Sequence, residues 1–131
     1  MRQNESLTIF ASGARLDSNS ADIVNVGYTG GIFTFDVTAT VSTATTPSFK
    51  IEGKVPGSTK YYRIATIAST ANTGVHRVVV YPGVSTANAS TVGVVAQEHV
   101  SQPLPHIFRI ASTGTGSTGT ITYSAGIDWL A

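Results

Sequence analysis

The chain has 131 residues and a mass of 13.6 kDa, a size that suits one domain, and 41% of its residues are hydrophobic. Only 11% are charged and the net charge is +1, so no overall field draws the protein to nucleic acid or to an anionic membrane. The chain lacks cysteine, which excludes disulfides and thiol catalysis.

Polar and apolar residues alternate in eight short stretches rich in β-branched residues, which is the pattern of half-buried strands. The clearest alternation lies in residues 32–41, where a Thr-rich row faces solvent and the predicted core face holds Phe33, Phe35, Val37 and Val41. Predicted strands cover residues 7–12, 23–26, 32–41, 49–54, 61–67, 75–81, 106–112 and 121–125. After the last strand, Ile127, Trp129 and Leu130 close the chain, and we expect Trp129 to cover the core.

Turn residues separate these stretches, and amphipathic helices are not evident between them. Predicted turns lie at residues 12–13, 17–20, 28–31, 56–59, 82–83 and 114–119. Residues 84–101 are ambiguous and fit either a long loop or a short turn of helix around residues 92–98.

The pattern predicts an all-β fold, an antiparallel β-sandwich of about eight strands in a single domain spanning residues 1–131. A jelly roll matches the strand number, and an immunoglobulin-like topology fits almost as well. Residues 1–6 are polar and unpatterned, so they suit either an extended N-terminal arm or a frayed terminus.

Candidate catalytic and metal-binding residues lack the spacing that such chemistry needs. His76, His99 and His106 match no zinc pattern, so we expect no metal and no cofactor, and three ordinary surface or half-buried histidines. Asp36 and Glu52 are the carboxylates that could be paired for glycoside hydrolysis, but Asp36 falls on the predicted solvent face. No Gly-x-Ser-x-Gly elbow is present, and we expect a protein that is not an enzyme.

Aromatic residues are the better indication of binding. A sugar-stacking platform or a protein interface could be formed by Tyr28, Tyr61, Tyr62, Tyr81 and Trp129. Tyr61 and Tyr62 are adjacent in a predicted strand, so one is expected in the core and the other in solvent.

The chain is similar to small head decoration, or cement, proteins of tailed bacteriophages. The segments that carry this resemblance are residues 33–39, 49–56 with 60–62, 80–84, 102–105 with 108–110, and 122–126. The resemblance implies a β-sandwich protein of the virion, made in the host cytoplasm and added to the outer surface of the assembled head. Its partners would be the major capsid protein and itself, as a homotrimer, with no nucleic acid and no membrane involved.

The family has no catalytic residues to transfer to this chain. Our candidates for capsid or subunit contact are Arg2, Gln3, Asn4, Trp129 and Leu130. Two other functions remain open at this point: a carbohydrate-binding β-sandwich module, and a tail, neck or fibre component of the same kind of virion. No predicted signal peptide or membrane-spanning stretch is present.

Overall fold

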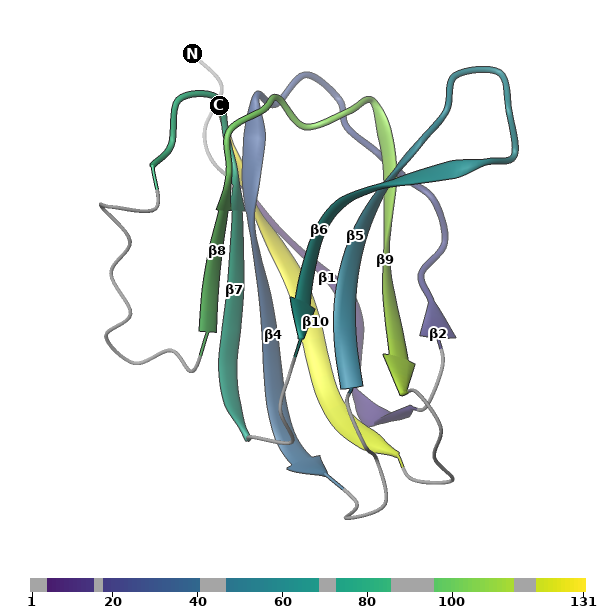
Figure 1. Cartoon of the computed structure of the whole chain (residues 1–131), viewed down its shortest axis with the longest axis vertical. Coiled ribbons are helices and arrows are strands. Elements are labelled where there is room, and N and C mark those ends of the chain that lie inside the picture. The colour runs from purple at the N-terminus through teal and green to yellow at the C-terminus, as the bar shows by residue number, and fades with distance from the viewer. Residues whose placement is uncertain (1–4, 16–17, 41–46, 69–72, 86–95, 115–119) are drawn as a thin grey trace.

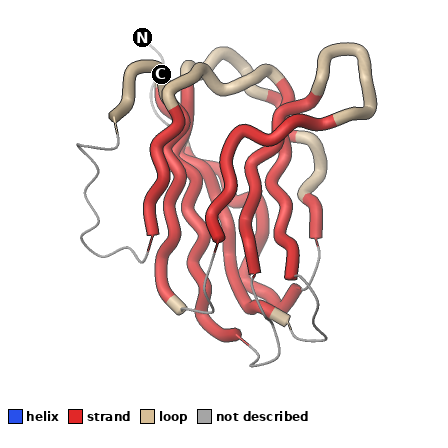
Figure 2. The backbone as a smooth tube through the Cα atoms, in the orientation of Figure 1, coloured by secondary structure: helices blue, strands red, loops and turns tan. Residues whose placement is uncertain are grey.

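The computed structural model describes residues 5–15, 18–40, 47–68, 73–85, 96–114 and 120–131 (Figure 1). These residues form strands and connecting loops, without helix (Figure 2), so they contain no helix that could cross a membrane. The strands are β1 (Ser6–Arg15), β2 (Ser18–Asn19), β3 (Ile23–Val24), β4 (Gly30–Thr40), β5 (Pro47–Lys54), β6 (Tyr61–Ala68), β7 (Gly74–Val80), β8 (Ala96–Val100), β9 (Ile107–Gly114) and β10 (Ile121–Leu130).

The strands form two packed sheets, which confirms the predicted β-sandwich. Sheet A has the order β1-β10-β4-β7-β8, and sheet B has the order β2-β9-β5-β6, with β3 also pairing with β9. With β2 and β3 taken as one interrupted strand, the first strand pairs with the last, the second with β9, β4 with β7, and β5 with β6. In this pairing the first half of the chain runs alongside the second half like the two arms of one long hairpin, and the folding of that hairpin into two sheets is the arrangement of a jelly roll. An immunoglobulin-like sheet would instead pair the first two strands of the chain.

The core lies between the inner faces of the two sheets. Phe33, Phe35 and Val37 are buried there as predicted, whereas Val41 lies outside the described residues. The ring of Phe35 on β4 stacks on Phe49 of β5, with centroids 4.4 Å apart. Such inter-sheet aromatic pairs contribute about 0.5–1.5 kcal/mol beyond the burial of their area. The alternation in the sequence therefore identified the faces that join the sheets.

The predicted turn at residues 28–31 is wrong at Gly30 and Gly31, which begin β4. A Cβ at Gly30 would lie 2.1 Å from the carbonyl oxygen of Val80, and one at Gly31 would lie 2.5 Å from Ile127 Cδ1. These glycines allow close packing inside the sandwich. The left-handed backbone occurs earlier, at Gly27, with φ of 104°.

The predicted turn at Ser12 and Gly13 is also wrong, because both residues continue β1. The β1–β10 register shifts between Thr8 and Phe10 and again between Phe10 and Gly13. Such bulges bend a strand without ending it. Ser18 and Asn19, also predicted as turn, form the short strand β2 on the other sheet, so β1 and β2 belong to different sheets.

The structure differs from expectation in three further places: at residues 96–100, at the end of β10 and in the possible N-terminal arm. Ala96–Val100 forms β8, parallel to β7, so residues 96–100 form neither the loop nor the short turn of helix that the sequence left open, and the sandwich is not wholly antiparallel. β10 continues to Leu130, beyond the predicted end. Of the possible arm 1–6, Ser6 lies in β1 and the carbonyl of Glu5 accepts a hydrogen bond from the Trp129 amide at 2.7 Å.

Candidate functional site

A hollow of about 450 Å³ lies at one end of sheet B, between the β5–β6 hairpin and the segment that leads into β9. Figure 1 shows this hairpin projecting beyond the body of the sandwich. The hollow is lined by Lys54, Val55, Pro56, Gly57, Ser58, Thr59, Tyr62, Pro105, His106 and Ile107. Its volume lies within the range of about 300–1,000 Å³ found for small-molecule sites.

The hairpin wall is a hydrogen-bonded turn, as its Pro56-Gly57 sequence predicts. The Val55 amide donates to the Lys60 carbonyl at 2.9 Å, and the Ser58 amide donates to the Val55 carbonyl at 3.1 Å. Gly57 has a φ of 69°, where a glycine avoids the strain of a side chain. These bonds hold the turn in one conformation, so this wall of the hollow is preformed.

The aromatic wall of the hollow depends on a glycine in the facing strand. Gly53 pairs with Tyr62 across β5 and β6, and a Cβ at Gly53 would lie 2.4 Å from Cζ of the Tyr62 ring. The ring therefore lies against the bare backbone of Gly53 while 42% of the residue stays exposed. Neither Tyr61 nor Tyr62 is buried in the core, so the predicted core tyrosine in this pair is wrong.

Asn25 holds the opposite wall through a buried polar network. Its side-chain amide donates to the Tyr28 carbonyl at 2.8 Å, and its Oδ1 accepts from the Tyr28 amide at 2.8 Å. Its backbone amide donates to the His106 carbonyl at 2.7 Å. His106 Nδ1 lies 3.1 Å from the Asn25 carbonyl, which can only accept, so Nδ1 carries a proton. In the neutral form of imidazole, this tautomer leaves Nε2 as a hydrogen-bond acceptor.

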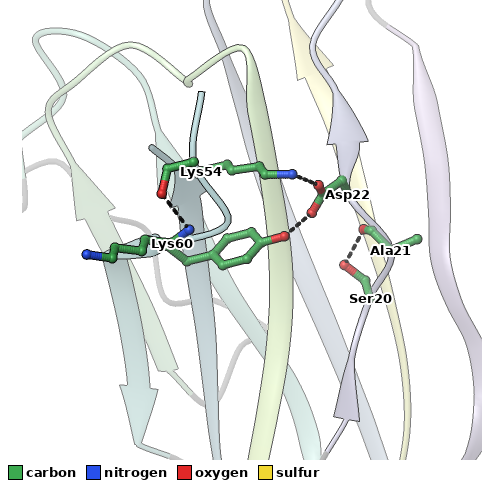
Figure 3. A network of polar contacts seen from close by, with 7 residues as sticks. Ser20, Ala21, Asp22, Lys54 and Lys60 are labelled. Atoms are coloured by element: carbon green, nitrogen blue, oxygen red, sulfur yellow. Dashed lines mark hydrogen bonds and ion pairs between the residues drawn. The ribbon is translucent and has the colours of Figure 1, made fainter. Parts of the chain in front are cut away.

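The carboxylate of Asp22 ties the hairpin to the β2–β3 connection (Figure 3). It accepts from Lys54 Nζ at 2.8 Å and from the Tyr61 hydroxyl. Because these bonds favour the ionised acid, the pKa of Asp22 lies below its ordinary value, first through Lys54 and then through Tyr61. The bond to Asp22 also raises the pKa of Lys54. The positive charge of Lys54 is therefore balanced by the negative charge of Asp22.

A second ion pair continues this network along the outer face of sheet B. Arg109 Nε donates to Glu52 at 3.0 Å, and the Arg109 guanidinium lies 3.6 Å from the centroid of the Tyr61 ring. Cross-strand pairs of opposite charge stabilise neighbouring strands. Tyr61, one of the five aromatic candidates for a sugar-stacking platform or a protein interface, is therefore occupied by contacts within the protein.

The predicted aromatic platform does not form. Tyr28 and Trp129 are buried and stack on each other, with ring centroids 5.0 Å apart, and this confirms the expectation that Trp129 covers the core. Tyr81 is half-buried and donates to the Ala131 carbonyl at 3.2 Å. Only Tyr62 of the five lines the hollow. Sequence alternation could not show this dispersal, because these residues come from different strands and loops.

The other candidate residues are also dispersed. Arg2, Gln3 and Asn4 lie outside the described residues, and Leu130 is half-buried at the end of β10. His76 is 1% exposed, so the expectation of three surface or half-buried histidines is wrong there. The described residues contain no cluster of three or more groups that could hold a metal ion.

Asp36 and Glu52 lie on opposite outer faces of the sandwich. Asp36 alternates with the buried residues of β4 in sheet A, and Glu52 alternates with those of β5 in sheet B. The core separates the two carboxylates, so they cannot act on one glycosidic bond.

The outer face of sheet A is rich in hydroxyl side chains. Its central strands present Ile32, Thr34, Asp36, Thr38, Thr122, Ser124, Gly126 and Asp128, as the alternation of burial and the β4–β10 register place them. Asp128 accepts from the Ser6 hydroxyl at 2.6 Å, and β7 adds Arg77 opposite Thr34. A partner that covers this face must replace the water of the hydroxyl groups and also pair with the charges of Asp36, Asp128 and Arg77.

No family model matches the chain, and no curated protein and no solved structure is significantly similar to it.

Proposed function

We propose that this protein is a decoration, or cement, protein of a tailed-phage head. In this proposal it binds the major capsid protein through the outer face of sheet A, on the outside of the assembled shell, and stabilises contacts between capsomers. The observation that carries the proposal is the Ser/Thr-rich outer face of sheet A, where Thr34, Thr38, Thr122 and Ser124 lie beside the charged residues Asp36, Arg77 and Asp128. The resemblance of the sequence to decoration proteins supplies the identity of the partner.

The physical argument concerns the free energy of covering this face. Interface centres are depleted in charged residues, because an ion that loses water without a matching partner costs several kcal/mol. Hydroxyl groups such as those of Thr34 and Ser124 can exchange water for a partner's polar groups at a smaller cost. A two-sheet sandwich with a closed aromatic core also provides a rigid support, so little conformational entropy is lost on docking.

Symmetry suggests how the protein would be arranged. A shell site with threefold symmetry accommodates three copies related by the same rotation. We therefore propose a homotrimer located on the outer surface of the virion. The same face could instead serve in a tail, neck or fibre, and binding to purified heads separates that possibility from head decoration.

The test introduces one charge at a time on the proposed docking face. In Thr34→Glu the new acid lies opposite Arg77, and in Ser124→Lys the new amine lies opposite Asp36. Each charge has a local partner, so both variants should fold. The matched control is Thr59→Lys in the exposed β5–β6 turn.

Binding to tailed-phage heads that lack the protein is measured by co-sedimentation. We expect each sheet A variant to weaken binding about tenfold or more, and Thr59→Lys to leave it unchanged. Because the two variants carry opposite charges, a shared loss cannot come from net charge. Full binding by both variants would contradict docking through sheet A, and no binding by the unmodified protein would contradict head decoration.

A further inference from the structure

We infer that the hollow beneath the β5–β6 hairpin is a binding site for a short, neutral saccharide. Its distinguishing feature is the combination of one preformed aromatic face with hydroxyl-compatible polar groups and no unbalanced charge. The site lies on sheet B, so it stays accessible when the outer face of sheet A is covered. The inference does not depend on the proposed function.

The stacking surface is the ring of Tyr62. A pyranose ring has a face of C–H groups that packs on an aromatic ring, and Tyr is suited to this because its hydroxyl can remain hydrated. The contact with Gly53 restricts the ring, because it lies where a side chain on Gly53 would be. A ligand that stacks on an already restricted ring loses less conformational entropy. Val55 and Pro56 extend the apolar part of this wall.

The polar groups of the hollow match sugar hydroxyls. The bond from His106 Nδ1 to the Asn25 carbonyl leaves Nε2 as an acceptor for an O–H donor. Thr59 adds a hydroxyl that can donate and accept. The Ser58 hydroxyl already accepts from the Lys60 amide at 3.0 Å, so its proton remains for a ligand oxygen.

The charge balance favours a neutral ligand over a phosphate or an acidic sugar. Lys54 is the only lysine or arginine among the lining residues, and its ammonium group is 2.8 Å from the Asp22 carboxylate. An anion at this site would be attracted by Lys54 and repelled by Asp22 at nearly the same distance, so the two effects largely cancel.

The experiment uses the full chain labelled with ¹⁵N and a panel of neutral sugars: glucose, galactose, mannose, N-acetylglucosamine, maltose, lactose and cellobiose. Amide chemical shifts follow each titration, because Trp129 lies in the core and its fluorescence would not report on the hollow. We expect at least one sugar to shift the amides of Thr59, Tyr62 and His106 saturably. Glucuronic acid and inorganic phosphate serve as anionic probes and should bind at least tenfold more weakly.

Variants assign the binding to the hollow. Tyr62→Ala and His106→Ala should each weaken it at least tenfold, whereas Tyr62→Phe, which keeps the ring, should stay within a few fold. The matched control is Leu7→Ala, which removes a side chain with the same 42% exposure as Tyr62 but on β1. Gly53→Ala should also reduce binding, because the new methyl group displaces the ring.

Three results would overturn the inference: no saturable shift with any neutral sugar, shifts confined to residues away from the hollow, or preferential binding of the anionic probes. The unperturbed spectrum of each variant shows whether it is folded. Binding to phage heads is measured in a separate experiment. A negative sugar titration therefore does not contradict head decoration, and a negative head-binding result does not contradict saccharide binding.

Discussion

The hydroxyl of Tyr123 donates a hydrogen bond of 2.8 Å to Oγ of Ser112 in the middle of the core. Tyr123 belongs to β10 of sheet A and Ser112 to β9 of sheet B, so this bond joins the two sheets. Both side chains are shielded from solvent, with exposures of 0% and 1%. A buried polar pair of this kind is stabilising only while both members are present.

Removing either hydroxyl should therefore destabilise the sandwich. We expect Tyr123→Phe and Ser112→Ala each to lower the free energy of unfolding by about 1–3 kcal/mol, because a buried partner is left unsatisfied. The double variant should cost less than the sum of the two single changes. Urea unfolding measures this, with the exposed Tyr62→Phe as a control near zero, and strict additivity would contradict a direct bond.

The same residue predicts a loss of stability at alkaline pH. Burial raises the pKa of Tyr123 above its ordinary value of 10.0, against smaller opposing effects of Ser112 and Arg15. The unfolded phenol thus ionises first, and the unfolded state binds fewer protons than the folded state above about pH 10. The stabilising contribution is complete below that pH and is lost as pH rises through the folded-state pKa.

The difference between the protein and its Tyr123→Phe variant isolates this effect. We expect the unfolding free energy of the unmodified protein to fall more steeply between about pH 9.5 and 11 than that of the variant. Thermal melts across this range provide the measurement. Parallel profiles would show that Tyr123 does not carry the alkaline transition.

Gly30 in β4 and Gly57 in the β5–β6 turn should lose different amounts of stability when each is replaced by alanine. The sequence alone would suggest the opposite order of the two losses. Gly30→Ala places a methyl group against the Val80 carbonyl, and a clash with backbone cannot be relieved by a side-chain rotation. We expect a loss of about 2 kcal/mol or more from such overpacking. Gly57→Ala, at φ of 69° with nothing within 4 Å of the new methyl group, should cost only about 1 kcal/mol. Equal effects in chemical denaturation would mean that Gly30 is not packed inside the sandwich.

The proposed trimer predicts a mass three times that of the 13.6 kDa chain. Light scattering of the free protein, repeated across a concentration series, tests this directly. A constant monomer mass at every concentration would contradict a preformed trimer, and threefold assembly would then have to occur on the shell.

Period-two alternation was enough to predict the sandwich and most of its inner faces. Residues such as Phe33 and Phe35 alternate with polar neighbours and were placed correctly. The errors at Ser12, Gly13, Gly30 and Gly31 have a common physical origin. Glycine is as suitable for close packing within a sheet as for a turn, and only the neighbouring strand decides between them.

The candidate site was less accessible to sequence reasoning, because its walls come from segments far apart in the chain. Asn25 and His106 contact each other across 81 positions, and nothing local to Asn25 indicates that it stabilises a distant wall. Tyr62 is one of the five aromatic candidates that the sequence offers. That Tyr62 and not Tyr61 lines the hollow depends on the register shift between Ile51 and Glu52 in β5. Pro56 and Gly57 were the one local signal of the projecting turn.

The most direct test of head decoration is the number of copies that bind to a purified head lacking the protein. Heads are titrated with the unmodified protein, sedimented, and the bound chain is quantified against the major capsid protein. The account predicts saturable binding at a fixed copy number compatible with icosahedral symmetry. Binding that is absent, or that rises without saturating, would contradict the proposal that this protein decorates a phage head.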